Sequence, residues 1–356
     1  MTGGAGFIGS NFVRLALADP DVSIVVVDNL TYAGRLENLA DLEGHPRFRF
    51  VRADIADGSA VQTLFAETRP QAVLNFAAET HVDRSIDGPR SFISSNIQGA
   101  FELLEAARLT LKGGAGAADF RFLHVSTDEV FGSLGTSGRF AESTPYAPRS
   151  PYAASKAAAD HLARAYYYTY DLPILVTNCS NNYGPWQLPE KLVPLIILKA
   201  LAGEDLPIYG DGANVRDWIF VEDHCRGLLE VLENGEPGES YNLGANCEQT
   251  NLEVVTAICA ILESRRPAGD NPAMIEHGLD SYADLLTFVD DRPGHDRRYA
   301  IDATKAREQL GWQASTDFQG GLEATVEWYI ENQAWCEAVR AEGLDGRRLG
   351  LLASQP

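Results

Sequence analysis

Short apolar runs rich in β-branched residues recur along the first half of this chain, and helix-compatible stretches separate them. Parallel strands need long crossover connections, which are usually helices, so this alternation predicts a parallel sheet. We therefore expect an α/β fold, a Rossmann-like doubly wound parallel sheet. The expected strands are 23–27, 48–51, 72–76, 120–125 and 174–177, and the expected helices include 60–68, 91–111 and 152–170.

The chain begins with a glycine-rich segment in which Gly3, Gly6 and Gly9 form a GxxGxxG pattern ahead of a helix-compatible stretch, 11–18. A dinucleotide-binding glycine loop lies between a buried strand and a helix. Here only two residues precede the loop, so the first strand of the sheet is missing from this chain. We expect a longer natural reading frame with a short apolar segment before Met1.

Asp28 ends the next apolar run, roughly 20 residues beyond the glycines, where an acid in a dinucleotide-binding unit binds the adenosine ribose hydroxyls. An anion there repels the additional phosphate of NADP, so the pattern favours NAD. The alternative is that Asp28 is only a turn residue before Asn29.

The composition of the chain changes after Asn178, where loops become longer and richer in Pro, Gly and Asn. We expect an NAD-binding domain over 1–180, with a later contribution around 218–245. A smaller, discontinuous substrate-binding domain then covers 181–330, because ligand sites form at domain boundaries. The alternative is a continuation of the same α/β domain. Residues 343–356 are expected to be a mobile tail.

The formal net charge of −21 over 356 residues argues against binding to nucleic acids or to anionic membranes, which both favour basic surfaces. The five cysteines are not spaced as CxxC, and we expect free thiols in a reducing compartment. No apolar run is long enough to span a membrane, and no secretory signal is visible. A cytoplasmic protein is expected.

Tyr152 and Lys156 lie four residues apart, which places both side chains on one face of a helix. A nearby ammonium favours the phenolate and lowers the tyrosine pKa, so Tyr152 can accept a proton from an alcohol while hydride leaves its carbon. The preceding strand ends in Ser126 and Thr127, which can orient a substrate hydroxyl. A tyrosine and a lysine at this spacing are common by chance, but the glycine loop and Asp28 add weight.

Asp128 and Glu129 follow directly and are either solvated loop acids or a catalytic pair. Two adjacent carboxyl groups can serve as acid and base if their environments separate their pKa values. A sugar 4-epimerase needs no such pair, whereas a dehydratase needs a base for one proton and an acid for the departing hydroxyl.

The glycine pattern, Asp28, Thr127 and the Tyr152–Lys156 pair together resemble the extended short-chain dehydrogenase/reductase superfamily over roughly residues 1–330. The Thr-Asp-Glu-Val run at 127–130 resembles its dTDP-glucose 4,6-dehydratases. The resemblance implies that Glu129 removes the C5 proton and that Asp128 protonates the C6 hydroxyl of a nucleotide sugar.

The same resemblance implies two sets of binding residues. The expected NAD-binding residues are Gly3, Gly6, Phe7, Ile8, Gly9, Asp28, Asn29, Leu30, Thr31, Asp54, Ile55, Phe76, Ala77, Ala78, Thr80, Ser95, Tyr152, Lys156 and Asn182. The expected substrate-binding residues are Thr80, Ser85, Thr127, Asn181, Lys191, Leu192, Pro207, Ile208, Tyr209, Arg216, Asn251, Arg292 and His295. Arg216 and Arg292 are the expected pyrophosphate pair, because guanidinium groups match phosphate oxygens.

Three alternatives remain open: a 4-epimerase of the same superfamily, a dehydratase that acts on another nucleotide sugar, and a non-catalytic NAD-sensing scaffold. The resemblance also implies a homodimer in which helices 91–111 and 152–170 form a four-helix bundle. We expect no metal site, because His81, His124 and His295 lie in separate segments without ligand spacing.

Overall fold

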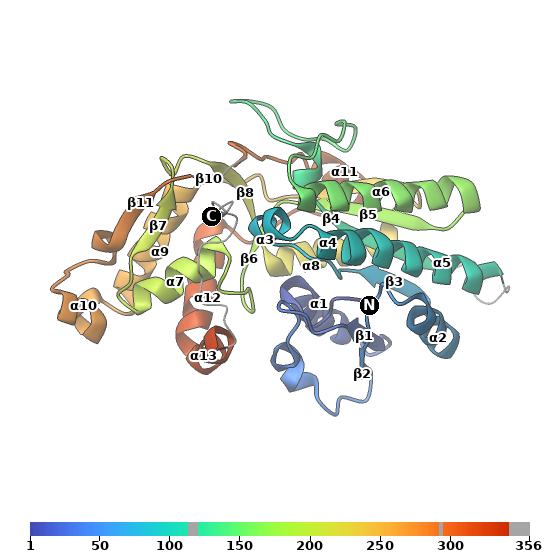
Figure 1. The fold of residues 1–356 in the computed structure, drawn as a ribbon, viewed down its shortest axis with the longest axis horizontal. Helices are drawn as coiled ribbons and strands as arrows, with labels where there is room; N and C mark the ends of the chain where they lie inside the picture. The colour runs from blue at the N-terminus through green and yellow to red at the C-terminus, as the bar shows by residue number, and fades with distance from the viewer. Residues whose placement is uncertain (113–119, 292–294, 342–356) are drawn as a thin grey trace, which may run out of the picture.

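The computed structural model of the chain describes residues 1–112, 120–291 and 295–341. The predicted tail 343–356 and Arg292 lie outside these residues. The structure confirms the predicted α/β fold, with a parallel sheet in the N-terminal part and smaller sheets with their own helices in the C-terminal part (Figure 1).

The main sheet is entirely parallel and contains all five of the predicted strands. One segment of it has the order β1-β2 and the other has the order β3-β4-β5-β9. Its strands are β1 (Ile24–Asp28), β2 (Phe48–Arg52), β3 (Ala72–Asn75), β4 (Arg121–Thr127), β5 (Ile174–Cys179) and β9 (Ser240–Leu243).

The first residues of the chain lie between these two segments of the sheet. Thr2 bridges Val27 of β1 and Asn75 of β3, both in the parallel sense. Its N–H donates to the carbonyl of Leu74 at 2.9 Å, and the N–H of Val27 donates to the carbonyl of Met1 at 2.8 Å. Residues 1–3 therefore occupy the predicted first-strand position.

Alternate residues of a strand point to opposite faces of the sheet, and both faces carry apolar side chains. Helices therefore cover both faces. Leu123 of β4 packs in one core with α1 (Phe7–Leu17) and α8 (Val221–Asn234). Its neighbour Phe122 packs in a second core with the helices of the other face. Those helices are α2 (Gly58–Thr68), α5 (Gly99–Lys112) and α6 (Pro151–Tyr170).

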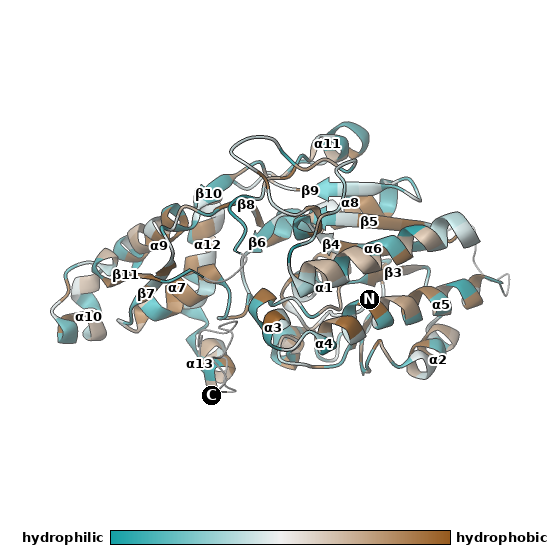
Figure 2. Ribbon diagram, turned by 45° about the horizontal axis from the view of Figure 1, so that its top comes forward, coloured by the Kyte–Doolittle hydropathy of each residue, from teal (hydrophilic) through white to brown (hydrophobic). Residues whose placement is uncertain are grey.

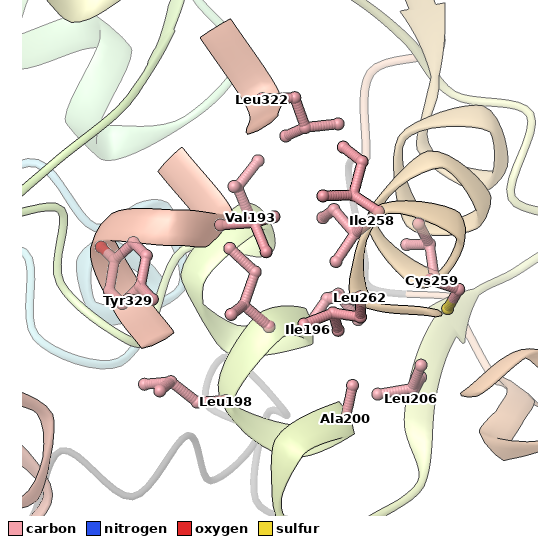
Figure 3. Packing of buried hydrophobic residues seen from close by; sticks show 14 of the residues in the cluster. Val193, Ile196, Leu198, Ala200, Leu206, Ile258, Cys259, Leu262, Leu322 and Tyr329 are labelled. Carbon is pink, nitrogen blue, oxygen red and sulfur yellow. The ribbon is translucent and has the colours of Figure 1, made fainter. Parts of the chain in front are cut away.

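The C-terminal part has a third apolar core, in which Val193, Ile258 and Leu322 meet (Figure 3). Strand β8 joins the parts, since Trp218 points into this core and Ile219 into the core beneath α1 and α8. Its sheets have the orders β10-β8-β6 and β11-β7. The strands are β6 (Asn181–Tyr183), β7 (Leu206–Tyr209), β8 (Val215–Phe220), β10 (Glu248–Thr250) and β11 (Leu286–Val289), and the longer helices are α7 (Leu192–Leu201), α9 (Asn251–Arg265) and α12 (Phe318–Glu331).

The remaining elements are short. The α-helices are α3 (Val82–Asp87), α4 (Arg90–Phe92), α10 (Pro272–His277), α11 (Thr304–Leu310) and α13 (Gln333–Ala341). The 3-10 helices are η1 (Leu36–Leu42), η3 (Asp128–Phe131), η4 (Ala268–Asp270) and η5 (Tyr282–Leu285), and η2 (Ile93–Gln98) is a π-helix.

The predicted helix 91–111 is not a single α-helix, because η2 separates α4 from α5. A π-turn places one additional residue in the helix and is frequent at functional sites. One of its residues, Ser95, lines the site described below, and the buried side chain of Asn96 is hydrogen-bonded to Glu79 and Ser155. None of the helices within the described residues is long and apolar enough to cross a membrane.

Candidate active site

A cleft of about 300 Å³ opens at the carboxyl ends of the parallel strands, the usual ligand-binding edge of a doubly wound sheet. Each strand from β1 to β5 contributes the residues that follow it. The lining therefore combines the glycine loop with the segments 28–34, 53–55, 76–80, 125–129 and 179–182, together with Tyr152 and Lys156 from α6.

The glycine loop leaves the first turn of α1 open toward this cleft. Gly6 is the N-cap of the helix and has no side chain to cover its free N–H groups. A Cβ on Gly3 would lie 2.6 Å from the backbone nitrogen of Ala77, and a Cβ on Gly9 would lie 2.3 Å from the carbonyl oxygen of Gly3. Larger residues do not fit here, and the exposed N–H groups suit a pyrophosphate.

Asp28 is held at the end of β1 by two backbone donors. Its Oδ2 accepts from the N–H of Ala5 at 3.0 Å, and its Oδ1 accepts from the N–H of Leu30 at 2.9 Å. Burial raises the pKa of Asp28, and the two backbone hydrogen bonds oppose this rise. Each carboxylate oxygen keeps a second lone pair, so the group can accept from two ribose hydroxyls.

Tyr152 and Lys156 lie in the first two turns of α6, whose N-cap Ser150 accepts from the N–H of Ala153 at 3.0 Å. The ammonium of Lys156 donates to the carbonyl of Val125 at 2.8 Å. Burial lowers the pKa of Lys156, and the negative charge of Asp160 opposes this.

The pKa of Tyr152 differs from the sequence-based expectation. Burial and the negative charge of Glu129 raise it well above its usual value, while a hydrogen bond with Thr127 acts in the opposite direction. The expected lowering by Lys156 does not prevail, because burial and the negative charge of Glu129 dominate the pKa of Tyr152. The protein alone therefore holds Tyr152 as a phenol.

Asp128 and Glu129 are neighbours in sequence but occupy different environments. The side chain of Thr127 caps η3 by accepting from the N–H of Glu129 at 3.3 Å. Asp128 is 2% exposed, and burial, followed by the negative charges of Glu129 and Asp217, raises its pKa well above the usual value. Glu129 is half-buried and lines the cleft. Burial therefore favours the protonated form of Asp128 and leaves Glu129 in contact with the cleft.

A second cavity of about 70 Å³ adjoins the cleft and shares Glu129 and Asn181 with it. Arg216 lines this cavity, with its guanidinium carbon 4.3 Å from the ring centre of Tyr299 and one nitrogen donating to the carbonyl of Asp296 at 2.9 Å. Lys191 donates to the carbonyl of Thr80 at 3.3 Å in the main cleft. Each of the two cavities that Glu129 lines therefore also has a cation in its lining, which suits an anionic substrate.

The structure brings together most of the predicted site residues. All five predicted catalytic residues line the main cleft, as do the predicted NAD-binding residues apart from Leu30, which contributes its backbone N–H to Asp28. Thr80, Asn181 and Lys191 line it as well. The predicted residues that line neither cavity are Ser85, Leu192, Pro207, Ile208, Tyr209, Asn251 and His295.

Two of these residues have other contacts. Ile208 is 1% exposed and packs in the C-terminal core. The hydroxyl of Ser85 donates to the carbonyl of Val82 at 2.5 Å. Their role in substrate binding remains a prediction.

Several lining residues were not predicted from the sequence: Ala33, Gly34, Ala53, Glu79, Val125, Cys179, Ser180, Gln187, Leu188 and Glu190. Glu190 has a side chain that is 7% exposed and lies 3.4 Å from the Nε of Arg84. Burial raises its pKa, and the charges of Lys191 and Arg84 oppose the rise. In the sequence, only the position of Glu190 directly before the predicted substrate-binding residue Lys191 could have indicated that it lines the cleft. None of the described residues forms a group of three or more side chains suited to a metal ion.

Comparisons with known proteins agree with this geometry. The family model of the GDP-mannose 4,6 dehydratases matches residues 1–325. The dTDP-glucose 4,6-dehydratase of Xanthomonas campestris is 55% identical over 348 residues, which cover 97% of this chain and 95% of the relative. The enzyme of the same name from Escherichia coli is 49% identical over 364 residues and covers 99% of both chains.

Solved structures lead to the same family. The dTDP-glucose 4,6-dehydratase DesIV from Streptomyces venezuelae, with NAD bound, superimposes with a TM-score of 0.84 at 46% identity and covers 95% of this chain and 98% of its own. A UDP-glucose 4-epimerase from Thermotoga maritima reaches a TM-score of 0.81 at 28% identity, covering 93% and 98%. With a family model that spans nearly all of the described residues, the chain belongs to the GDP-mannose 4,6 dehydratase family of Rossmann-fold enzymes.

Proposed function

We propose that this protein is a dTDP-glucose 4,6-dehydratase, which converts dTDP-glucose to dTDP-4-keto-6-deoxyglucose and water through bound NAD. The observation that carries the proposal is the pair Asp128 and Glu129, one buried and one open to both cavities, next to Tyr152. Relatives of that name are 55% identical to this chain over almost its whole length.

The cleft fits NAD. The first turn of α1 presents free N–H groups to a pyrophosphate behind Gly6, and Asp28 presents a carboxylate to the adenosine ribose. The negative charge of Asp28 disfavours a 2′-phosphate. NAD held by the glycine loop and Asp28 would supply hydride transfer between C4 and C6 of the sugar, and its positive charge would favour ionisation of Tyr152.

The residues of the chain then perform the proton transfers. Tyr152 takes the proton of the C4 hydroxyl, and the positive charge of Lys156 stabilises the phenolate form of Tyr152. The C4 ketone acidifies the C5 hydrogen, which Glu129 removes as a proton. Asp128, protonated because it is buried, gives its proton to the C6 hydroxyl as water leaves. Glu129 finally returns its proton to C5.

A 4-epimerase is the second candidate, because a UDP-glucose 4-epimerase shares the fold. An epimerase has no elimination step, and a buried neutral acid beside a base serves none of its steps. Purified protein is incubated with dTDP-glucose, with UDP-glucose as the matched control. The alkali-induced absorbance of a 4-keto sugar is expected with dTDP-glucose. Formation of dTDP-galactose without this absorbance would establish the epimerase instead.

The homodimer is also a proposal, supported by an outward-facing stripe on α6. Ala154, His161, Ala165 and Tyr168 are exposed and Ala158 is half-buried, at spacings of three and four residues. Helix α5 lies beside α6 in Figures 1 and 2 and exposes Phe101 and Leu109. Small residues allow close approach of a second copy. Ala158→Arg is expected to convert a dimer to a monomer in sedimentation experiments.

We propose a cytoplasmic location as well. All five cysteines are free, and Cys179, Cys225, Cys259 and Cys336 are buried. Unpaired thiols are typical of a reducing compartment. Fractionation of cells that produce the protein tests this location.

A further inference from the structure

Helix α13, which lies beside α12 in Figure 1, contacts the NAD-binding part of the protein through one side chain. The indole N–H of Trp335 donates to Oδ1 of Asn38 at 2.9 Å. Asn38 lies in η1 and is 1% exposed, and the indole is buried as well. The two residues are 297 positions apart, so this buried hydrogen bond joins a helix of the C-terminal part to the N-terminal part.

Asn38 is bonded in turn to the glycine loop. Its Nδ2 donates to the carbonyl of Ala5 at 2.8 Å, and the N–H of Ala5 donates to Oδ2 of Asp28 at 3.0 Å. Ala5 lies between Gly3 and Gly6, and both glycines line the cleft. Three consecutive hydrogen bonds between buried groups therefore connect Trp335 to the carboxylate that the proposed function assigns to the adenosine ribose.

The indole N–H fixes the direction in which the amide of Asn38 faces. An indole nitrogen only donates, so it meets the amide oxygen, and the amide NH2 group then faces the carbonyl of Ala5. Without the indole, the buried amide oxygen would lose this partner. A rotated amide would place its oxygen against the Ala5 carbonyl, where two acceptors repel each other. Trp335 thus determines whether Asn38 can hold the loop.

Ring contacts hold Trp335 at the junction of the two parts. Its ring centre lies 5.7 Å from that of Trp186 and 5.2 Å from that of Trp328, both in edge-to-face geometry. Trp186 directly precedes Gln187, which lines the cleft. The guanidinium carbon of Arg14 in α1 lies 4.9 Å from the ring centre of Trp186. The indole is therefore packed against a segment that borders the cofactor site.

The proposed reaction uses one NAD molecule in two steps of each turnover, so the cofactor must stay bound between these steps. On the basis of that proposed function, we propose that Trp335 is a positioning residue for NAD, which acts through Asn38 to hold the glycine loop and Asp28 in the arrangement that retains the cofactor. Trp335 itself lines neither cavity. The loop must be held precisely, because backbone N–H groups bind a pyrophosphate only when they point toward it.

The test compares Trp335→Phe, which removes the indole N–H but keeps an aromatic ring, with Trp328→Phe. The control loses the same volume from the same aromatic cluster and leaves the donor to Asn38 in place. Each full-length protein is loaded with NAD, freed of excess cofactor and diluted into ethanol and alcohol dehydrogenase, which reduces NAD as it is released. The absorbance of reduced nicotinamide reports the release rate. Trp335→Phe is expected to release NAD about five- to tenfold faster than the control, the usual effect of losing one buried hydrogen bond.

Two further measurements separate cofactor positioning from general stability. The Tm of each protein without NAD is expected to be similar for Trp335→Phe and Trp328→Phe, because both substitutions remove the same volume. With saturating NAD added, turnover of dTDP-glucose by Trp335→Phe is expected to approach that of the control. Such a recovery places the defect in the retention of NAD rather than in proton transfer.

Asn38→Ala tests whether Trp335 acts through Asn38. The double variant is expected to release NAD no faster than Asn38→Ala alone, since the path is already broken. Independent effects of the two substitutions would overturn the proposal, as would equal release rates for Trp335→Phe and Trp328→Phe. If Trp335→Phe does not fold, release from Asn38→Ala at the rate of the unaltered protein overturns it. The release assay contains no sugar, so failure of the proposed function is distinct: the unaltered protein would then form no 4-keto product.

Discussion

Replacing Asp160 by asparagine should destabilise the protein and shift its activity to lower pH. Asp160 lies one turn beyond Lys156 in α6 and is fully buried. Its Oδ2 accepts from the hydroxyls of Ser126 and Tyr146, both at 2.8 Å, and its Oδ1 lies 3.3 Å from Nε2 of His124. Burial opposes ionisation of Asp160, but its interactions with His124, Lys156 and Ser126 outweigh burial and lower the pKa.

The destabilisation expected for Asp160→Asn comes from the loss of a negative charge, not from a change in side-chain volume. Asparagine keeps the volume of Asp160 but removes a buried carboxylate that accepts hydrogen bonds from Ser126 and Tyr146. Because each hydrogen bond to a charged group contributes about 1.5–3 kcal/mol, the loss of the charge should cost about 3–5 kcal/mol. The free energy of unfolding should fall by about that amount. Tm should fall by about 5 °C, since the entropy of unfolding is about 2.1 cal/mol/K per residue.

The pH dependence has a defined direction. The charge of Asp160 opposes the burial that lowers the pKa of Lys156, so its removal lowers that pKa further. Neutralisation of Lys156 then begins at lower pH, and the alkaline limb of the kcat profile moves to lower pH.

The matched control is Ser126→Ala, which removes one hydrogen bond to Asp160 and no charge. It should cost about 1.5–3 kcal/mol, the range for a hydrogen bond to a charged group, and leave the alkaline limb in place. Urea unfolding and pH–rate profiles of the two variants measure both effects. An Asp160→Asn variant that matches Ser126→Ala in stability, with an unmoved alkaline limb, would refute the assigned role of Asp160.

Three further predictions concern the cleft. Glu129→Gln should abolish elimination but allow the absorbance of reduced nicotinamide to appear with dTDP-glucose, and full dehydratase activity would exclude Glu129 as the base. Asp128→Asn should lower turnover by about 10²–10⁴-fold. Because the pKa of Asp128 is raised by folding, the wild type is most stable where Asp128 is protonated, at low pH, and loses this stability as pH rises. The Tm of Asp128→Asn minus the Tm of the wild type should therefore increase between about pH 4 and pH 8, and a constant difference would contradict this. Asp28→Asn should weaken NAD binding by about tenfold or more and reduce discrimination against NADP in titration calorimetry, whereas unchanged selectivity would remove Asp28 from the ribose site.

Local patterns in the sequence were sufficient for much of the fold. The alternation of apolar strands with helices follows from short-range spacing, and the structure has all five predicted strands in a parallel sheet. The π-turn at η2 was not predictable in this way. Asn96 within it accepts from the N–H of Glu79 at 2.8 Å and donates to the hydroxyl of Ser155 at 2.8 Å, and these long-range contacts leave no periodic signal.

The sequence by itself predicted the catalytic residues and most of the NAD-binding residues that meet at the cleft. Strand ends and the four-residue spacing of Tyr152 and Lys156 are properties of neighbouring residues, and the folded chain needs only a parallel sheet to bring them to one edge. The tertiary structure alone decided their protonation. Asp128 and Glu129 differ in burial although they are adjacent, and Lys156 bonds to the carbonyl of Val125, 31 positions earlier. Burial and long-range contacts set the energy of a charge, and neither exists until the chain has folded.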